Sequence, residues 1–215
     1  FGNNRKNSGQ SVKAKTLEAM AEVCGYKLNQ TNAKDGVNPN DTNAEFQLEK
    51  NKIEKIKIGL FGFGRIGRNI FRIGYEDPRF EFVAISDLGD VEAMHYLLMR
   101  DSIHGAMKSD IRLEGKDLIY NESSTRLLPG AAPGSIPWDA FDVDMVIDST
   151  GVYRKREELQ MHIDSGAKRV LVSKPPVNEI DRIVIQGINE DQIKYNDKII
   201  STTSSTTQVL ALMMK

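Results

Sequence analysis

The sequence Gly62-Phe63-Gly64-Arg65-Ile66-Gly67 stands between a strand-like stretch and a helix-like stretch. Before it, apolar and other residues alternate in Ile56-Lys57-Ile58-Gly59-Leu60, which is the period of a strand with one face in a core. After it, apolar residues recur at helical spacing, at Ile66, Ile70, Phe71 and Ile73. A G-x-G-x-x-G pattern alone is weak evidence, but strand, glycine turn and helix together are the context of a dinucleotide-binding fingerprint.

The three glycines of this stretch have different predicted tasks. Gly62 permits the tight turn, Gly64 lets the backbone approach a pyrophosphate, and Gly67 lets the helix pack closely on the strand. The N-terminus of the helix adds free N–H groups and the positive end of the helix dipole. We therefore predict that all three glycines belong to a cofactor-binding site.

A carboxylate follows the next apolar run. Asp87 lies just past Phe80–Ile85, roughly 20 residues after the glycines, where such a residue accepts hydrogen bonds from both ribose hydroxyls of an adenosine. It would also repel a 2′-phosphate, so the pattern predicts NAD rather than NADP. The alternative is an α/β fold in which a glycine turn and a strand-end aspartate bind nothing.

The composition excludes several classes of protein. The chain has 215 residues and a net charge of −1, which fits one ordinary domain plus an appendage and gives no field that attracts nucleic acid or an anionic membrane. It contains no apolar run of bilayer length and no zinc-type Cys/His cluster, so we expect neither a membrane span nor a metal site. The single cysteine, Cys24, is typical of a reducing compartment, either the cytoplasm or the interior of an organelle.

Two regions differ in character. Residues 1–54 form a polar N-terminal extension with a linker-like stretch at 38–43. Within the extension, apolar residues recur at helical spacing, at Leu17, Met20, Ala21, Cys24 and Leu28. This short helix docks on a partner or on the chain's own domain, or else it is a marginal helix that frays alone.

Residues 55–215 alternate strand and helix patterns, which predicts an α/β fold of Rossmann type: a mostly parallel sheet with flanking helices. We expect a helix at 91–99 capped by Asp90, a hairpin of 111–113 with 118–120, and a helix at 154–165 closed by Gly166. Residues 129–137 are turn-rich, and Trp138 is expected to pack on the flank of the domain. Further strands are expected at 143–147, 169–172, 183–185 and 199–201, and a helix from Thr207.

Four stretches together resemble the glyceraldehyde-3-phosphate dehydrogenase family. They are Ile58–Arg68, Arg100–Gly105, Asp148–Tyr153 and Gly166–Val170, and they occur in that family's order and spacing. The resemblance runs from about Ile56 to Lys215, which corresponds to the nucleotide-binding half, and residues 1–54 show no such match.

The resemblance implies a role for individual residues. The backbone N–H groups of Arg65 and Ile66 would meet the pyrophosphate, and Asp87 would hold the adenosine ribose. The remaining implied cofactor contacts are Ser149, Thr150 and Gly151 along the groove and Ser173 near the nicotinamide. The three histidines, His95, His104 and His162, are expected to be structural.

The main departure from the family lies near the end of the chain. The run Ser201-Thr202-Thr203-Ser204-Ser205-Thr206-Thr207-Gln208 has Ser205 where the family keeps its reactive cysteine, and Gln208 where it keeps an asparagine. A thiol with a pKa near 8.5 becomes a thiolate at a helix N-terminus beside a histidine, whereas a serine hydroxyl needs a strong adjacent base. The family's catalytic histidine and substrate-phosphate residues belong to a second half, which we expect to be absent from this chain.

These observations favour a catalytically inactive relative, a pseudoenzyme that holds NAD and acts as a subunit, scaffold or regulator in a complex. Its partners would be other protein subunits, bound through the N-terminal helix and through the apolar residues after Thr207. The alternative is an active NAD-dependent aldehyde oxidoreductase in which Ser205, or a hydroxyl of Thr203, Ser204 or Thr206, contacts the substrate. A nucleic-acid-binding role is disfavoured because no basic stripe with interleaved aromatic residues is present.

Overall fold

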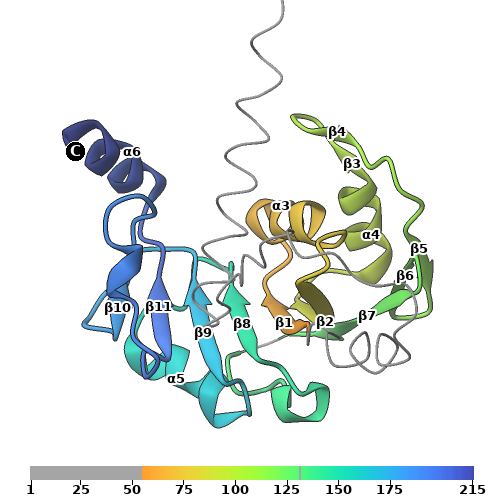
Figure 1. Cartoon of the computed structure of the whole chain (residues 1–215). Helices are drawn as coiled ribbons and strands as arrows, with labels where there is room; N and C mark the ends of the chain where they lie inside the picture. Colours follow the sequence, from red (N-terminus) through yellow and green to blue (C-terminus); the bar gives the residue numbers. More distant parts are fainter. Residues whose placement is uncertain (1–54, 131) are drawn as a thin grey trace, which may run out of the picture.

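The computed structural model describes residues 55–130 and 132–215 (Figure 1). The predicted extension at 1–54, with its helical stripe and linker, lies outside the described residues, so the domain boundary at 54/55 stays a prediction. Within the described residues, one sheet of nine strands has the order β10-β11-β9-β8-β1-β2-β7-β6-β5.

The bounds of the elements largely follow the expected ones. The strands of the sheet are β1 Ile56–Phe61, β2 Phe80–Asp87, β5 Arg112–Glu114, β6 Asp117–Tyr120, β7 Ser123–Pro129, β8 Met145–Asp148, β9 Arg169–Val172, β10 Arg182–Ile183 and β11 Ile199–Ser201. A separate pair is formed by β3 Arg100–Asp101 and β4 Gly105–Ala106. The helices are α3 Arg65–Gly74, α4 Val91–Met99, α5 Arg156–Asp164 and α6 Ser205–Met214, with 3₁₀ turns η1 Trp138–Phe141 and η2 Glu190–Gln192.

The sheet is mostly parallel. Strands β10, β11, β9, β8, β1, β2 and β7 pair in parallel, and only β6 and β5 run antiparallel at one edge. From β1 the chain moves to β2 on one side and later to β8 on the other, so the strand order reverses between β1 and β8. This arrangement confirms the predicted Rossmann-type fold class and creates a topological switch point at that position.

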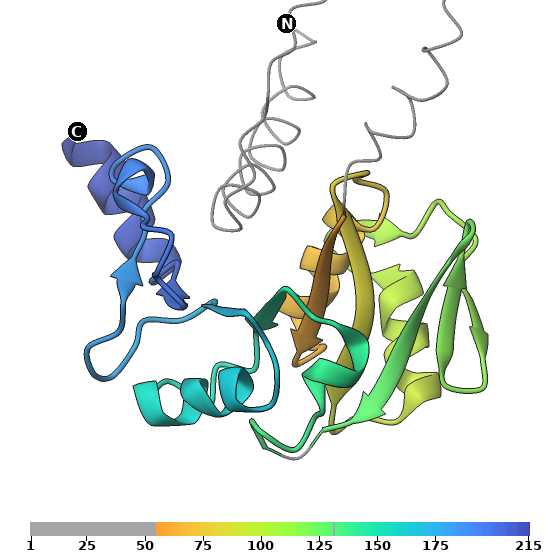
Figure 2. The ribbon, with the colours of Figure 1, turned by 60° about the horizontal axis from the view of Figure 1, so that its bottom comes forward.

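Each face of the sheet has its own core. On one face Ile58 and Leu60 of β1 pack with Phe71 of α3 and Leu98 of α4. On the other face Phe61 packs in a second cluster with η1, because side chains alternate across a strand. Figure 2 shows the antiparallel edge, β5 to β7, on one side of the molecule and β10, β11 and α6 on the opposite side.

Several details differ from the sequence-based expectations, among them the start of α6 at Ser205 and not at Thr207. Strand β7 was not expected, because in Ser123–Pro129 the buried positions include a threonine, Thr125, which donates to the carbonyl of Phe82 at 2.6 Å. Strand β10 is shorter than the expected strand 183–185 and begins one residue earlier. Trp138 is not on the flank but completely buried, so close to β1 that a Cβ on Gly59 would lie 2.6 Å from its ring. Among the described helices, none is long and apolar enough to cross a bilayer.

Candidate functional site

The switch point gathers the predicted cofactor residues at one edge of the sheet. The turn 62–67 follows β1, Asp87 ends β2, residues 149–151 follow β8, and Ser173 follows β9. All four strands are parallel, so their carboxyl ends open on the same side, which is where ligands bind in sheets of this kind. The structure thus brings together the ten residues that the sequence nominated.

The three glycines are held for different reasons. Gly62 has a φ of +92°, and a Cβ on it would lie 2.8 Å from the backbone nitrogen of Thr150. A Cβ on Gly67 would lie 2.1 Å from the carbonyl oxygen of Gly62, so helix α3 starts in direct contact with the turn. Gly64 is the opposite case, because no described heavy atom lies within 4 Å of the position of its Cβ. The turn therefore leaves an open approach to the backbone at Gly64.

The N-terminus of α3 faces this opening without a protein acceptor of its own. Gly64 is the N-cap residue and provides no side-chain hydrogen bond, and the first turn has no acidic residue. Arg65 and Ile66 are exposed, and the Ile66 side chain keeps 48% of its accessible surface. Free N–H groups and the positive end of the helix dipole together form an anion-binding position.

Asp87 is fixed by two backbone donors. Its Oδ2 accepts from the N–H of Phe63 at 2.5 Å, and its Oδ1 accepts from the N–H of Gly89 at 2.8 Å. A carboxylate has about four lone-pair positions, so each oxygen can still accept from a hydroxyl group. The carboxylate is thus tied to the glycine turn and has acceptor capacity left for a diol.

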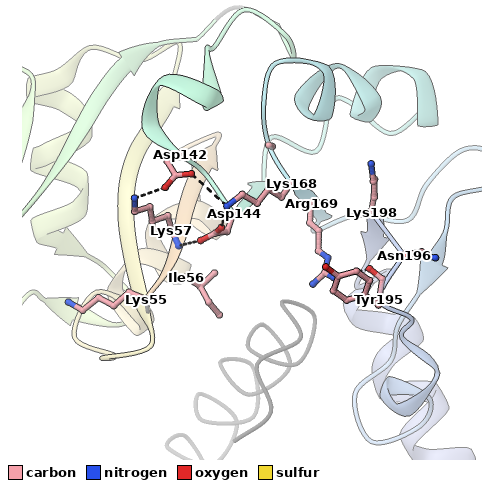
Figure 3. A pocket seen from close by; sticks show the side chains of 11 residues that line it. Lys55, Ile56, Lys57, Asp142, Asp144, Lys168, Arg169, Tyr195, Asn196 and Lys198 are labelled. Carbon is pink, nitrogen blue, oxygen red and sulfur yellow. Dashed lines mark hydrogen bonds and ion pairs between the residues drawn. The ribbon is translucent and has the colours of Figure 1, made fainter. Parts of the chain in front are cut away.

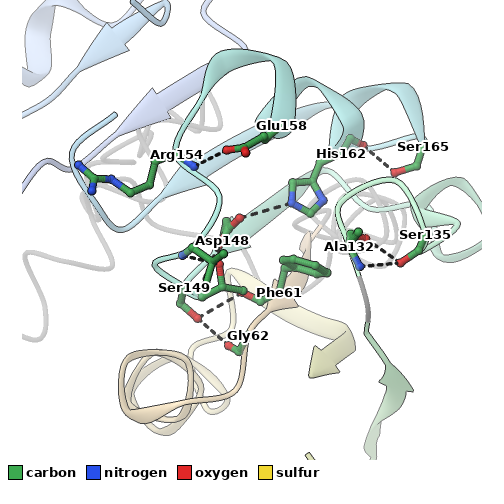
Figure 4. A network of polar contacts seen from close by, with 12 residues as sticks. Phe61, Gly62, Ala132, Ser135, Asp148, Ser149, Arg154, Glu158, His162 and Ser165 are labelled. Atoms are coloured by element: carbon green, nitrogen blue, oxygen red, sulfur yellow. Dashed lines mark hydrogen bonds and ion pairs between the residues drawn. The ribbon is translucent and has the colours of Figure 1, made fainter. Parts of the chain in front are cut away.

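The loop after β8 is tied to the same turn. Ser149 donates from its hydroxyl to the carbonyl of Gly62 at 2.6 Å (Figure 4). Gly151 has a φ of +73°, which favours glycine. Thr150 donates to Asp148 from both its N–H, at 2.9 Å, and its hydroxyl, at 2.7 Å. The hydroxyl of Ser173 is buried and has no hydrogen-bond partner among the described residues.

These features fit NAD. The open position at Gly64 and the uncapped helix end suit a pyrophosphate, the carboxylate of Asp87 suits a ribose diol, and the unpartnered Ser173 hydroxyl suits the polar end of the molecule. When bound, NAD supplies a hydride acceptor; the chain's own residues supply binding and orientation.

Ser205 lies in the run of hydroxyl side chains that opens helix α6. It is the exposed first residue of α6, and its neighbour Ser204 caps the helix by accepting from the N–H of Thr207 at 3.1 Å. The side-chain amide of Gln208 donates to the carbonyl of Thr202 at 2.6 Å. No histidine or carboxylate of the described residues hydrogen-bonds to the Ser205 hydroxyl.

The histidines do not contact Ser205; two of them have other hydrogen-bond partners among the described residues. His95 contacts the carbonyl of Ile111 at 2.7 Å, and His104 contacts Asp101 at 3.1 Å. The backbone N–H groups of His104 and Ile103 hold the pKa of Asp101 at about 2, well below its usual 3.8. The third histidine, His162, is completely buried.

Sequence reasoning missed three residues that support the site: Asp148, His162 and Trp138. Asp148 is completely buried at the end of β8, with His162 beside it. A histidine at a single helical position gives no sequence signal for such a contact. The available signal was an ionisable residue, Asp148, that ends an otherwise apolar buried strand.

A cavity of about 730 Å³ lies at the other end of the sheet (Figure 3). It is lined by residues at the starts of β1, β8 and β9, opposite to the strand ends that carry the glycine turn. Its two central lysines are already paired: Lys57 with Asp142 at 2.8 Å, and Lys168 with Asp144 at 2.6 Å. We therefore do not assign the nucleotide to this cavity.

Helix α5 begins at a carboxylate cap. Glu158 accepts from the N–H of Lys155 at 3.0 Å and from that of Arg154 at 2.9 Å, and these donors lower its pKa (Figure 4). The cap fixes the start of the helix that carries His162.

Comparisons with known proteins agree with this geometry. Residues 56–156 match the family described as glyceraldehyde 3-phosphate dehydrogenase, NAD binding domain. The chain is 39% identical over 163 residues to glyceraldehyde-3-phosphate dehydrogenase of Geobacillus stearothermophilus, which covers 74% of this chain and 48% of the relative. It is 37% identical over 161 residues to glyceraldehyde-3-phosphate dehydrogenase 1 of Bacillus subtilis (strain 168), with the same shares covered. The chain thus spans about half the length of the curated relatives it matches.

Proposed function

Because the described part of this chain is a nucleotide-binding half of the glyceraldehyde-3-phosphate dehydrogenase family, we propose that the chain binds NAD but does not oxidise an aldehyde. Its role is that of a subunit, scaffold or regulator in a protein assembly. The observation that carries the binding proposal is the open, uncapped glycine turn next to Asp87 at the switch point. The observation that carries the inactivity is the serine at position 205.

Different residues bind different parts of NAD. The N–H groups of Arg65 and Ile66 hold the pyrophosphate, and Asp87 accepts the hydroxyls of the adenosine ribose. A 2′-phosphate at that ribose would meet a carboxylate that already accepts from Phe63 and Gly89, so NAD is preferred over NADP. Ser149, Thr150 and Gly151 line the groove, and Ser173 contacts the nicotinamide end.

Inactivity follows from the chemistry of position 205. Aldehyde oxidation through a covalent adduct needs a nucleophile that is ionised or that has an adjacent base. A serine hydroxyl is not appreciably ionised at neutral pH, and no base of the described residues contacts Ser205. The Ser205 side chain is therefore expected to form no covalent adduct with an aldehyde, even with NAD bound.

Two measurements on the intact protein test the binding proposal and the inactivity proposal separately. A calorimetric titration with NAD is expected to give saturable binding in the micromolar range, and absence of binding would end the cofactor proposal. An assay with glyceraldehyde 3-phosphate, NAD and phosphate is expected to show no turnover. Steady turnover with a covalent acyl group on Ser205 would end the inactivity proposal.

The proposed assembly role is supported by the surface of α6. All ten of its residues are at least partly exposed, including large apolar side chains, and Met213 and Met214 keep 79% and 78% of their surface. Exposed apolar surface of this kind is typical of a contact site. Sedimentation of the intact protein is expected to show a complex that Met213→Glu weakens; an unchanged single-chain mass in both would argue against the role. The single cysteine of the sequence, Cys24, supports the proposal of a reducing compartment, cytoplasmic or inside an organelle.

One observation favours an active oxidoreductase as a second candidate. Thr203, two residues before Ser205, is buried with a φ of +55°, and strain in a β-branched residue is common next to functional sites. In this alternative Ser205 or a neighbouring hydroxyl contacts an aldehyde. A screen of small aldehydes for NAD reduction decides it: activity lost in Ser205→Ala supports the alternative, and no activity in the whole screen removes it.

A further inference from the structure

We propose that His162 is a positioning residue for the nucleotide groove: its Nε2–H faces Asp148, and Asp148 holds the groove loop through Thr150 and Ser173. The effect on NAD affinity rests on the proposed function, whereas the effect on the loop itself does not. His162 reaches the loop through Asp148.

Trp138 determines which nitrogen of His162 carries the proton. The indole Nε1–H lies 3.1 Å from Nδ1 of His162, and both side chains are completely buried. An indole nitrogen can only donate, so Nδ1 must accept. The proton of the imidazole is therefore on Nε2, and the ring presents a donor on the side away from Trp138.

That donor points at Asp148. Nε2 lies 3.6 Å from Oδ2 of Asp148, with both side chains at 0% exposure (Figure 4). Among the described residues, neither atom has any other hydrogen-bond partner. A buried donor and a buried acceptor without partners are costly, and each is the natural complement of the other. At 3.6 Å the pair is just outside hydrogen-bond length, so a small movement completes the bond.

Asp148 also forms hydrogen bonds with residues that line the groove. Its Oδ1 accepts from the N–H of Thr150 at 2.9 Å and from the Thr150 hydroxyl at 2.7 Å. Its carbonyl accepts from the N–H of Ser173 at 3.0 Å. The backbone nitrogen of Thr150 lies 2.8 Å from the position that a Cβ on Gly62 would take. The loop therefore packs directly against the glycine turn. Helix α5 is thereby linked, through one histidine and one aspartate, to three predicted cofactor residues.

Two substitutions separate positioning from simple core stability. His162→Gln places an amide donor near the former Nε2 and gives up the acceptor for Trp138. His162→Asn places an amide oxygen near the former Nδ1 and gives up the donor to Asp148. Each variant loses one buried polar contact of the imidazole, so a purely structural role predicts that the Gln variant, which loses the hydrogen bond from Trp138, is affected at least as much as the Asn variant.

The measurement is hydrogen exchange of the Thr150 amide in the protein without nucleotide. We expect His162→Gln to stay within about threefold of the unsubstituted protein, and His162→Asn to exchange roughly tenfold faster. Asp148→Asn is expected to match His162→Asn, because its amide cannot both accept from Thr150 and accept from Nε2–H. His95→Gln is the control, since His95 contacts Ile111 elsewhere in the fold. Equal exchange of Thr150 in the Gln and Asn variants at position 162 would overturn the proposal, as would unchanged exchange in Asp148→Asn if the position-162 variants do not fold.

An NAD titration of the same variants extends the test. The dissociation constant is expected to rise roughly tenfold in His162→Asn and to stay within about threefold in His162→Gln. If the unsubstituted protein does not bind NAD, the proposed function fails, and the exchange result still decides whether His162 positions the loop. If NAD binds equally to all variants while Thr150 exchange differs, the link from the loop to affinity is refuted.

Discussion

Replacement of Gly64 by alanine separates the fold of the glycine turn from its proposed use. Gly64 has a φ of −65° and a ψ of −165°, which alanine adopts without strain, and no described heavy atom lies within 4 Å of the added methyl group. The free energy of unfolding should therefore fall by at most about 1 kcal/mol, the usual cost of alanine at an N-cap position.

The effect on binding should be much larger. The methyl group would occupy the position where the backbone is proposed to meet the pyrophosphate. Forcing an extra methyl group into a packed contact costs about 1–3 kcal/mol, so the dissociation constant of NAD should rise roughly tenfold to hundredfold.

Calorimetric titration with NAD and thermal unfolding without it measure the two quantities on one preparation. Gly67→Ala is the contrasting variant, because its methyl group would lie 2.1 Å from the carbonyl oxygen of Gly62 and should destabilise the fold itself. An unchanged NAD affinity in a normally folded Gly64→Ala variant would refute the assignment of the pyrophosphate to this turn.

Three further predictions concern other residues. Asp87→Asn should raise the dissociation constant of NAD at least tenfold, because hydrogen bonds to a charged group contribute about 1.5–3 kcal/mol, and should raise that of NADP less; titrations with both nucleotides check it. Ser205→Cys should add one alkylatable thiol, seen by mass spectrometry, without dehydrogenase turnover; turnover would show that a base acts there. The folded-state pKa of Asp101, about 2, lies below its ordinary 3.8, so the stability that it contributes is present above about pH 4 and lost as the pH falls towards 2. Exchange of the Ile103 and His104 amides across that range should show it, and a loss of protection already above pH 5 would contradict it.

The local sequence pattern was sufficient to predict the strands and helices that position the site. The alternation before Gly62 and the helical spacing after Gly67 predicted β1 and α3, and Asp90 marked the start of α4. Each of these signals lies within a few residues of the element that it predicts. Strand β7 was not predicted because its buried Thr125 hydroxyl donates a hydrogen bond to the carbonyl of Phe82, which is distant in sequence. A single sequence does not reveal such a partner.

The support of the site could not be predicted for the same reason. Nothing near His162 in the sequence indicates that it faces Asp148, and nothing near Trp138 indicates that it lies against Gly59 and His162. These contacts exist only once the sheet has placed β8 beside β1 and α5 has packed against β9 and β11. The residues that touch the proposed ligand follow a sequence motif, whereas those that hold them depend on tertiary packing.

The most direct test is to locate the bound nucleotide on the protein. Amide chemical shifts followed during an NAD titration should change most at Gly64, Arg65 and Ile66 and at the Asp87 end of β2, with smaller changes around Thr150. Changes centred on the cavity at the other end of the sheet, near Lys57 and Lys168, or no changes at saturating NAD, would contradict a nucleotide groove at the switch point.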